Sequence, residues 1–219
     1  MVYFKEYNAP PLNKKEILRY MGCREVSPQI GQAVEECIDE LCARLNYRVC
    51  FSEFSVKVQN GTADLQFMKT ESKSFVNYLK GCEKAMLFAA TIGLEADRAI
   101  VKYSSLSPLK SSIFQAIGAE RIESLCDVFE KDLCKKMSLQ KMYIKPRFSP
   151  GYGDFPLEAQ KDIFRVLDCC RKIGLTLNES LIMSPSKSVT AIIGITASPE
   201  EKKIKKCARC NMAGCAYRR

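Results

Sequence analysis

An irregular connection over residues 145–160 is the feature that most limits how this chain folds. It reads K-P-R-F-S-P-G-Y-G-D-F-P-L-E-A-Q and follows a short apolar run at residues 142–144. Proline fixes φ and glycine accepts backbone conformations closed to other residues, so this composition predicts sharp turns between a strand and a helix. We expect Asp154 or Pro156 to open that helix, with unpaired N–H groups facing the connection. Such a backbone predicts either a ligand-binding loop or a rigid turn.

The rest of the chain alternates between helical and strand patterns. Ser27 and Pro28 have the residue types preferred at the cap and first position of a helix, and apolar residues recur every three or four positions after them. Asn60-Gly61 is typical of a two-residue hairpin turn. Expected helices cover residues 14–20, 73–79, 94–103, 109–137 and 157–173, with one more from Pro28; expected strands cover 48–58, 63–68, 84–93, 178–183 and 188–196. This order predicts an α+β fold with mainly antiparallel pairing rather than a doubly wound sheet.

Charge and composition narrow the classes of function. The formal net charge is +9, and residues 200–219 carry +5 of it, so the remainder is roughly neutral. A nucleic-acid surface spreads basic residues over a face of the fold, so we expect no nucleic-acid partner. Histidine is absent, which excludes any mechanism based on an imidazole.

The chain shows no apolar run of secretory or membrane-spanning length. Twelve cysteines without a secretion signal indicate a reducing compartment, where thiols act as metal ligands or redox groups rather than as disulfides. We therefore expect a cytoplasmic protein without a membrane partner.

Arg147 and Tyr152 supply the chemistry of the connection. A guanidinium can grip a carboxylate or phosphate with two parallel hydrogen bonds, and a tyrosine ring face attracts a cation. The structural alternatives are a helix-capping or surface ion pair for Arg147 and a core-anchoring role for Tyr152.

Several sequence blocks occur in a recognisable order. Residues 147–152 read R-F-S-P-G-Y, residues 153–160 continue G-D-F-P-L-E-A-Q, and I-G-L-T-L-N-E-S and M-S-P-S-K-S-V-T-A-I-I-G follow at residues 173–180 and 183–194. Earlier, L-F-A-A-T-I-G occupies residues 87–93. These blocks resemble the activation (reactivation) domain of cobalamin-dependent methionine synthase, whose signature is Arg-x-x-x-Gly-Tyr. The resemblance spans roughly residues 80–196, after N-terminal helices and a hairpin in residues 1–80.

The resemblance implies a curved antiparallel sheet with flanking helices. It implies an S-adenosylmethionine-binding domain over residues 1–199, in the form of a stand-alone reactivation subunit, with residues 200–219 as a basic cysteine-rich tail. In the family, one electron and the methyl group of S-adenosylmethionine restore methylcobalamin from cob(II)alamin. The implied partners are a corrinoid-binding methionine synthase, which carries the cobalamin, and flavodoxin or another electron donor. The chain would act as a component of that methyltransferase, without a catalytic residue of its own.

The resemblance also implies the ligand contacts. Arg147 would hold the carboxylate or ribose end of S-adenosylmethionine, and Tyr152 would face the corrinoid. An acidic partner for the ligand's amino group is expected on the long helix, where Glu120 and Glu123 are the candidates. The backbone expected to lie along the ligand belongs to Phe148, Ser149, Pro150 and Gly151.

Two departures from the family pattern concern the adenine side of that site. Lys202-Lys203 stand where the family can offer a second tyrosine, and the N-terminal elaboration is shorter.

The tail carries a second chemical signal. Cys207, Cys210 and Cys215 follow a C-x2-C-x4-C pattern, which can place three thiolates on one metal. A fourth ligand would come from Cys169-Cys170, Cys82 or Cys134, giving a zinc or iron–sulfur site; the alternative is a tail with reduced thiols. The sequence thus favours the reactivation function, with two alternatives: a redox activase of another corrinoid methyltransferase, or a zinc-dependent interaction module.

Overall fold

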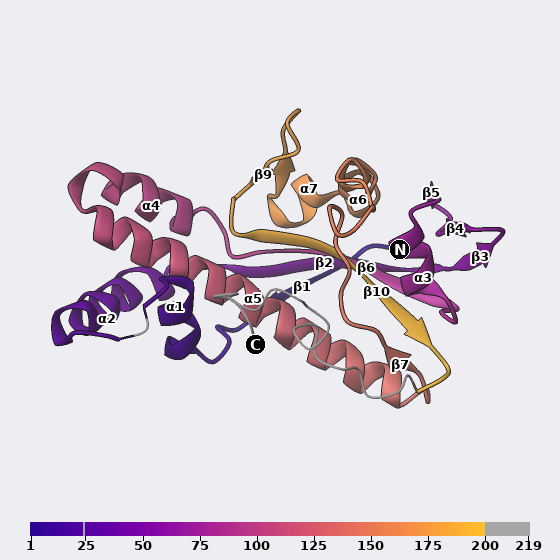
Figure 1. Cartoon of the computed structure of the whole chain (residues 1–219), viewed down its shortest axis with the longest axis horizontal. Coiled ribbons are helices and arrows are strands. Elements are labelled where there is room, and N and C mark those ends of the chain that lie inside the picture. The colour runs from indigo at the N-terminus through magenta and orange to yellow at the C-terminus, as the bar shows by residue number, and fades with distance from the viewer. Residues whose placement is uncertain (24, 200–219) are drawn as a thin grey trace.

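An antiparallel sheet lies between two groups of helices in the computed structural model, which describes residues 1–23 and 25–199 (Figure 1). The helices are α1 (Lys14–Tyr20), α2 (Pro28–Cys42), α3 (Lys73–Leu79), α4 (Glu95–Leu106), α5 (Pro108–Ser138), α6 (Ala159–Leu167) and α7 (Cys169–Ile173).

The strands form one main sheet and two small ones. The main sheet has the order β1-β2-β6-β10-β7, and every neighbouring pair in it is antiparallel. The strands are β1 (Tyr3–Tyr7), β2 (Tyr47–Ser55), β3 (Lys57–Gln59), β4 (Thr62–Asp64), β5 (Lys69–Thr70), β6 (Lys84–Thr91), β7 (Tyr143–Ile144), β8 (Thr176–Leu177), β9 (Met183–Ser184) and β10 (Ser188–Thr196).

The central strand β6 is buried on both faces because helices cover the sheet on both sides. Met86 and Phe88 belong to the core on the α5 side, whereas Leu87 and Ala89 belong to the core on the other side. A strand covered on both faces reads as a continuous apolar run, which explains the uninterrupted hydrophobic stretch at residues 85–90.

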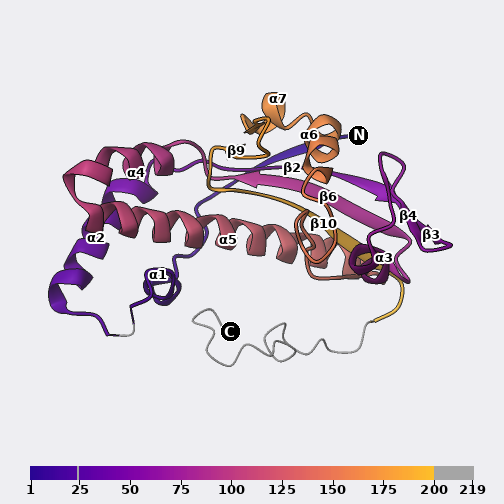
Figure 2. The ribbon, with the colours of Figure 1, turned by 45° about the horizontal axis from the view of Figure 1, so that its top comes forward.

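The long helix α5 runs across one face of the sheet, and α1, α2 and α4 complete that layer (Figures 1 and 2). Ile117, Leu125 and Phe129 lie on its buried side. The ring of Phe129 packs against that of Phe88, with 4.8 Å between centroids. Helix α5 therefore closes one face of the core with its buried side and presents a rigid outer surface.

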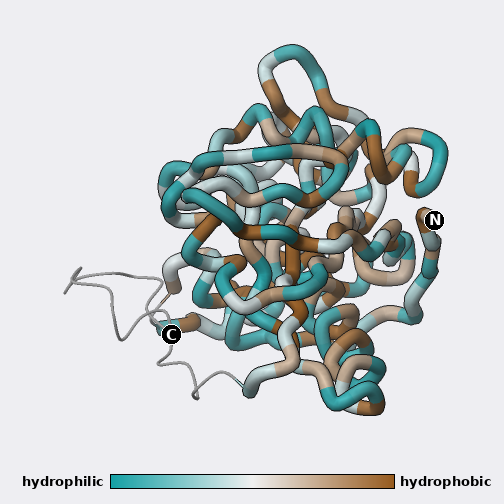
Figure 3. The backbone as a smooth tube through the Cα atoms, turned by 90° about the vertical axis from the view of Figure 1, so that its right-hand side faces the viewer, coloured by the Kyte–Doolittle hydropathy of each residue, from teal (hydrophilic) through white to brown (hydrophobic). Residues whose placement is uncertain are grey.

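The opposite core is formed with α3, α6 and α7. Its centre is aromatic, and the rings of Phe75 and Phe155 stack with 4.2 Å between centroids and 7° between planes. Figure 3 shows hydrophobic segments through the middle of the molecule and hydrophilic ones along the outer loops.

The predicted α+β class with a mainly antiparallel sheet is confirmed. The helices expected at residues 14–20 and 73–79 have the predicted bounds, and the one expected from Pro28 begins there. Asn60 (φ 50°) and Gly61 (φ 76°) form the predicted turn between β3 and β4, as a two-residue hairpin with both central residues left-handed requires. The domain boundary before residue 200 stays a prediction, because residues 200–219 lie outside the described part.

Two of the local predictions are wrong, and one strand was missed. The expected helix at residues 157–173 is two helices, α6 and α7, because Asp168 takes a left-handed conformation (φ 50°) between them. Residues 178–182 of the strand expected at 178–183 form instead the loop that joins β8 to β9, and only Met183 lies in a strand. Strand β1 was not predicted, because its exposed residues lack the alternation of a half-buried strand.

Among the described helices, none combines the length and apolar character needed to cross a bilayer.

The double-sided burial of β6 predicts a large effect of truncating its central aromatic residue. Phe88→Ala should lower the free energy of unfolding by ~3–5 kcal/mol, because Phe88 is fully buried and contacts Phe129. Phe4→Ala, at a 47% exposed site on β1, is the matched control and should change it by under ~1 kcal/mol. Urea unfolding measures both, and equal effects would contradict this account of the core.

Candidate functional site

Backbone hydrogen bonds attach the loop over residues 145–158 to the edge of β10. The backbone N–H of Lys145 donates to Gly194 O at 2.8 Å, and Phe148 and Ile192 exchange two backbone hydrogen bonds of 2.9 Å. These bonds hold the first part of the loop as an extension of the sheet, so the backbone of Arg147 has a fixed position.

The tip of the loop turns at two glycines with left-handed backbones, Gly151 (φ 88°) and Gly153 (φ 59°). The N–H of Gly151 donates to Phe155 O at 2.8 Å and closes the turn. A Cβ at Gly153 would lie 2.5 Å from Ser74 Oγ, so a side chain there would collide with α3 as well as strain the backbone.

Asp154 caps α3 and does not open the helix that follows the loop, so that prediction is wrong. Its carboxylate accepts from Ser72 Oγ at 2.6 Å, Lys73 N at 2.7 Å and Ser74 N at 2.9 Å. These hydrogen bonds, that from Ser72 foremost, hold the pKa of Asp154 well below its usual range. Residues 72–74 and the loop are thereby joined across more than seventy positions of sequence.

The two aromatic residues of the loop have different environments. Phe148 packs among the rings of Phe75, Tyr78 and Phe155, which anchors the loop to the core. Tyr152 is 51% exposed and meets the ring of Phe148 edge-on, with 5.8 Å between centroids. The anchoring function therefore belongs to Phe148, and much of the Tyr152 side chain faces solvent.

Arg147 reaches from the loop to three carboxylates on α5. Its Nη2 donates to Glu123 Oε2 at 2.6 Å, and its Nη1 donates to Glu130 Oε1 at 2.6 Å and Asp127 Oδ1 at 3.3 Å. The Arg147 side chain is only 18% exposed. Because residues 123, 127 and 130 are four and three apart, they share one face of the helix.

This cluster has more negative than positive charge, and the pKa directions reflect it. Burial raises the pKa of Glu130 from its ordinary value, and the neighbouring Asp127 and Glu123 act in the same direction against Arg147. Burial lowers the pKa of Arg147, but the surrounding acidic groups outweigh it and the net direction is upward. Arg147 therefore stays charged at any relevant pH.

Glu120, the other acidic candidate, is engaged in a buried network. It forms an ion pair with Arg121, and both side chains are only 2% exposed. Its Oε1 also accepts from Ser124 Oγ at 2.7 Å and from Asn13 N at 3.1 Å. Arg121 donates to Pro10 O at 2.7 Å, so the network fixes the segment that leads into α1.

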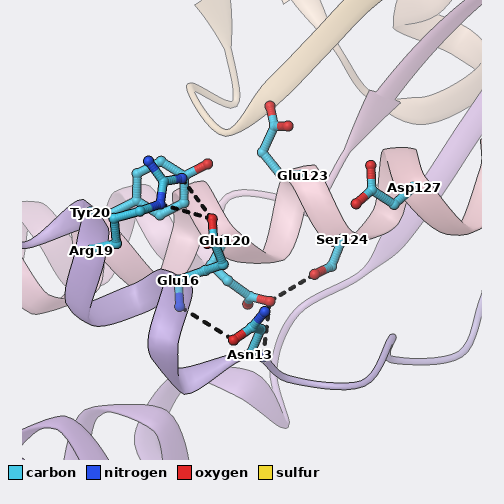
Figure 4. A pocket seen from close by; sticks show the side chains of 8 residues that line it. All are labelled: Asn13, Glu16, Arg19, Tyr20, Glu120, Glu123, Ser124 and Asp127. Carbon is cyan, nitrogen blue, oxygen red and sulfur yellow. Dashed lines mark hydrogen bonds and ion pairs between the residues drawn. The ribbon is translucent and has the colours of Figure 1, made fainter. Parts of the chain in front are cut away.

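A pocket of about 380 Å³ opens between α1 and α5 (Figure 4). Glu123 and Asp127 lie on its α5 side, and Arg19 and Tyr20 lie on its α1 side. Two ion-paired partners of Arg147 therefore also line the pocket, which places the loop at its border. The lining residues are Asn13, Glu16, Arg19, Tyr20, Glu120, Glu123, Ser124 and Asp127.

The structure thus brings Glu120, Glu123 and Arg147 into one region. Sequence analysis missed the α1 wall and Asp127. The spacing of Asp127 from Glu123 was the available signal, but carboxylates four apart on a helix are usually solvated and do not by themselves mark a site.

The metal prediction falls mostly outside the described residues, where Cys207, Cys210 and Cys215 lie. Within residues 1–23 and 25–199, no group of three or more His, Cys, Asp or Glu side chains is placed to hold a metal. Of the proposed fourth ligands, Cys82 and Cys169 are buried whereas Cys134 and Cys170 are exposed. Interaction with Cys50 and burial raise the pKa of the Cys169 thiol.

Comparison with known protein families shows to which family the chain belongs. The family described as "Vitamin B12 dependent methionine synthase, activation domain" matches residues 73–219. The chain belongs to this family. The activation domain is also similar to a solved structure, "Crystal Structure of the MetH Reactivation Domain bound to AdoHcy", with a TM-score of 0.66 and 16% sequence identity. That similarity covers 93% of this chain and 80% of the other, and shows a shared fold. No curated protein matches the chain.

The buried pair predicts a strong effect of removing one partner. Arg121→Ala should lower the free energy of unfolding by ~3–5 kcal/mol, because it leaves the Glu120 carboxylate buried without its cation. Arg98→Ala removes an exposed ion pair with Glu95 and should change it by ~0–1 kcal/mol. Chemical denaturation of the two variants tests this, and a small effect of Arg121→Ala would show that the network is not needed.

The raised pKa of Glu130 predicts a pH-dependent effect. Folding raises the pKa of the Glu130 carboxyl above its ordinary value of 4.5. The folded protein therefore loses stability as the pH rises above 4.5 and this carboxyl ionises. Glu130→Gln removes that loss, so its free energy of unfolding relative to the wild type should increase between pH 4.5 and 7.5.

The matched control for that series is Asp132→Asn on the same helix. A hydrogen bond from Lys5 lowers the pKa of Asp132, so its contribution is already complete above its ordinary value of 3.8. The stability of Asp132→Asn relative to the wild type should then be nearly constant from pH 4.5 to 7.5. A flat response of Glu130→Gln would contradict an upward shift of the Glu130 pKa on folding.

Proposed function

We propose that this activation domain binds S-adenosylmethionine in the pocket between α1 and α5 and supports reductive methylation of cob(II)alamin in a corrinoid-dependent methionine synthase. One observation carries the proposal. Arg147 begins the Arg-x-x-x-Gly-Tyr signature and forms ion pairs with Glu123 and Asp127, which both line the pocket. We therefore infer that the sequence signature of the family and the cavity belong to one site.

The size and charge of the pocket support this ligand. A volume of about 380 Å³ falls within the range of roughly 300–1,000 Å³ typical of small-molecule sites. Its carboxylates suit the amino group and sulfonium of S-adenosylmethionine, and Arg147 suits the ligand's carboxylate. The structurally similar reactivation domain is bound to AdoHcy, the demethylated form of the same molecule, which supports the same ligand class for this chain.

Arg147 must exchange partners for the ligand to be held as proposed. Its guanidinium is occupied by three carboxylates, so the ligand's carboxylate would replace Asp127, whose 3.3 Å contact is the longest of the three. The displaced Asp127 and the neighbouring Glu123 then face the ligand's ammonium. Glu123 is a better amino-group partner than Glu120, because the Glu120 carboxylate already serves Arg121, Ser124 and Asn13.

The remaining loop residues have supporting functions in this proposal. The backbone of residues 148–151 lies along the ligand, held in place by the hydrogen bonds of Phe148 with β10. Tyr152, half-exposed at the loop tip, contacts the docked corrinoid-binding part. The bound cobalamin of the partner supplies the cobalt that accepts the methyl group. This chain positions the sulfonium and shields it from water, and no residue needs to move a proton.

The partners in this proposal are the corrinoid-binding part of methionine synthase and an electron donor such as flavodoxin. The donor supplies the one electron that the reaction requires. The basic residues of the tail suit an acidic surface on either partner.

Titration calorimetry of S-adenosylmethionine tests the proposal directly. The wild type should bind, and Arg147→Ala and Glu123→Gln should each weaken binding at least tenfold, the equivalent of ~1.4 kcal/mol. Arg165→Ala, which removes an exposed arginine on α6 paired with Asp162, is the control and should bind like the wild type.

Arg147→Lys separates charge from geometry, because lysine keeps the cation but not the planar fork. Circular dichroism of each variant checks that it is folded. Absence of binding to the wild type, both alone and with a corrinoid-loaded partner domain present, would contradict the proposal.

A further inference from the structure

We propose that the three cysteines of the tail bind one zinc ion together with Cys82, which lies beside the last residues of β10. The three tail ligands are Cys207, Cys210 and Cys215, whose thiols have no part in the proposed function. The inference is independent of that function, because it concerns another ligand and another part of the chain.

The spacing of the tail cysteines favours zinc over an iron–sulfur cluster. Both intervals, C-x2-C and C-x4-C, fall within the C-x2–4-C range that is typical of zinc ligands. Neither ferredoxin arrangement, C-x2-C-x2-C-x3-C or C-x4-C-x2-C, has this order of intervals. Structural zinc sites are closed by four protein ligands, and the chain has no histidine, so the fourth ligand must be another cysteine or a carboxylate.

The sulfur of Cys82 lies next to the point where the tail leaves the fold. A Cβ at Gly194 would lie 2.7 Å from Cys82 Sγ, so the thiol packs against the backbone of β10 two residues before that strand ends. The N–H of Glu83 donates to Ile195 O at 3.1 Å and holds the same turn against the strand. Pro199 and Cys207 are eight residues apart, a length that spans up to roughly 26 Å when extended, so the tail thiols can return to Cys82.

The surroundings of Cys82 suit a metal-bound thiolate. The ammonium of Lys145 donates to Tyr78 O at 2.9 Å and to Lys80 O at 2.8 Å, which places a buried cation at the turn that carries Cys82. A neighbouring cation stabilises the thiolate, which is the form that binds a metal. Cys82 is 8% exposed, so packing already fixes its position and binding costs little side-chain entropy.

The cysteines of α7 lie at the wrong end of the sheet for this site. Ile173 of α7 shares a cavity with Thr91, and Thr91 pairs with Ser188, the first residue of β10. The nine residues of β10 separate that end from the exit of the tail by roughly 30 Å. Cys169 is in addition fully buried, and Cys170 is an exposed thiol on the same short helix.

Cys134 is the remaining candidate from the sequence, and it is an exposed side chain of α5. Helix α5 packs on the opposite face of the sheet from the core that contains Cys82. An exposed helical side chain loses more rotamer freedom on metal binding than a packed one, which favours Cys82.

Zinc at this position would affect the Arg147 loop through its first residue. The N–H of Lys145 donates to Gly194 O, and the side chain of Lys145 would lie 3.4 Å from a Cβ at Gly194. The proposed site therefore joins the tail, the turn between α3 and β6 and the base of the loop.

Zinc analysis and X-ray absorption spectroscopy of the full chain, purified without chelators, test the inference. The wild type should hold one zinc ion per chain, with four sulfur ligands at ~2.3 Å. Cys82→Ser should show three sulfur ligands and one lighter atom, and should bind zinc at least about tenfold more weakly in competition with a chelator. Cys210→Ser, which changes no residue of the described core, should lose stoichiometric zinc.

Cys134→Ser and Cys170→Ser remove exposed thiols and are the matched controls. Both should keep the zinc content and the four sulfur ligands of the wild type, and circular dichroism checks that each variant is folded. If Cys82→Ser does not fold, the wild type and these two controls still decide, because they leave Cys82 intact.

The inference has clear contrary outcomes. Fewer than four sulfur ligands in the wild type, loss of a sulfur ligand in either control, or four sulfur ligands in Cys82→Ser would overturn Cys82 as the fourth ligand. Iron and sulfide in anaerobically purified protein, or no bound metal after incubation with zinc, would overturn the assignment of zinc.

Discussion

The attachment of Arg147 to α5 is the interaction on which the candidate site depends. The loop carrying it is fixed to β10 by backbone hydrogen bonds and to the aromatic core by Phe148. The carboxylates that pair with Arg147 belong to α5, which spans the other face of the sheet. One side chain therefore connects the two layers of the fold at the point where the pocket opens, and the site geometry follows from how rigidly each layer is packed.

That rigidity comes from the sheet. Strand β6 is covered on both faces, so α5 and the loop are each held against the same buried strands rather than against each other alone. The Glu120–Arg121 pair extends this order to the N-terminal segment, because Arg121 binds the carbonyl of Pro10 and Glu120 binds the N–H of Asn13. Contacts with α5 therefore fix the positions of both walls of the pocket.

Sequence patterns were sufficient for most of the fold, and they named Arg147 and Glu123 as candidates for the site. Caps, the Asn60-Gly61 turn and apolar periodicity identified the helices and strands, because those signals are local. The division at Asp168 and the exposed strand β1 were missed, since the first needs an unusual backbone conformation in a non-glycine residue and the second is stabilised by pairing with β2. The motif singled out Arg147, but its partners on α5 are set by tertiary packing, so neither Asp127 nor the α1 wall was predicted.

The cap that Asp154 provides to α3 has an evolutionary consequence. Because one carboxylate serves Ser72, Lys73 and Ser74, and Gly153 leaves no space beside Ser74, the length of the loop between Arg147 and Asp154 is fixed at both ends. Insertions or deletions within it would separate the arginine from α5 or the aspartate from α3. The tip of the β3–β4 hairpin, where a Cβ at Gly61 would meet no atom within 4 Å, carries no such constraint. Relatives of this chain should therefore vary in length at the hairpin and keep one length in the loop.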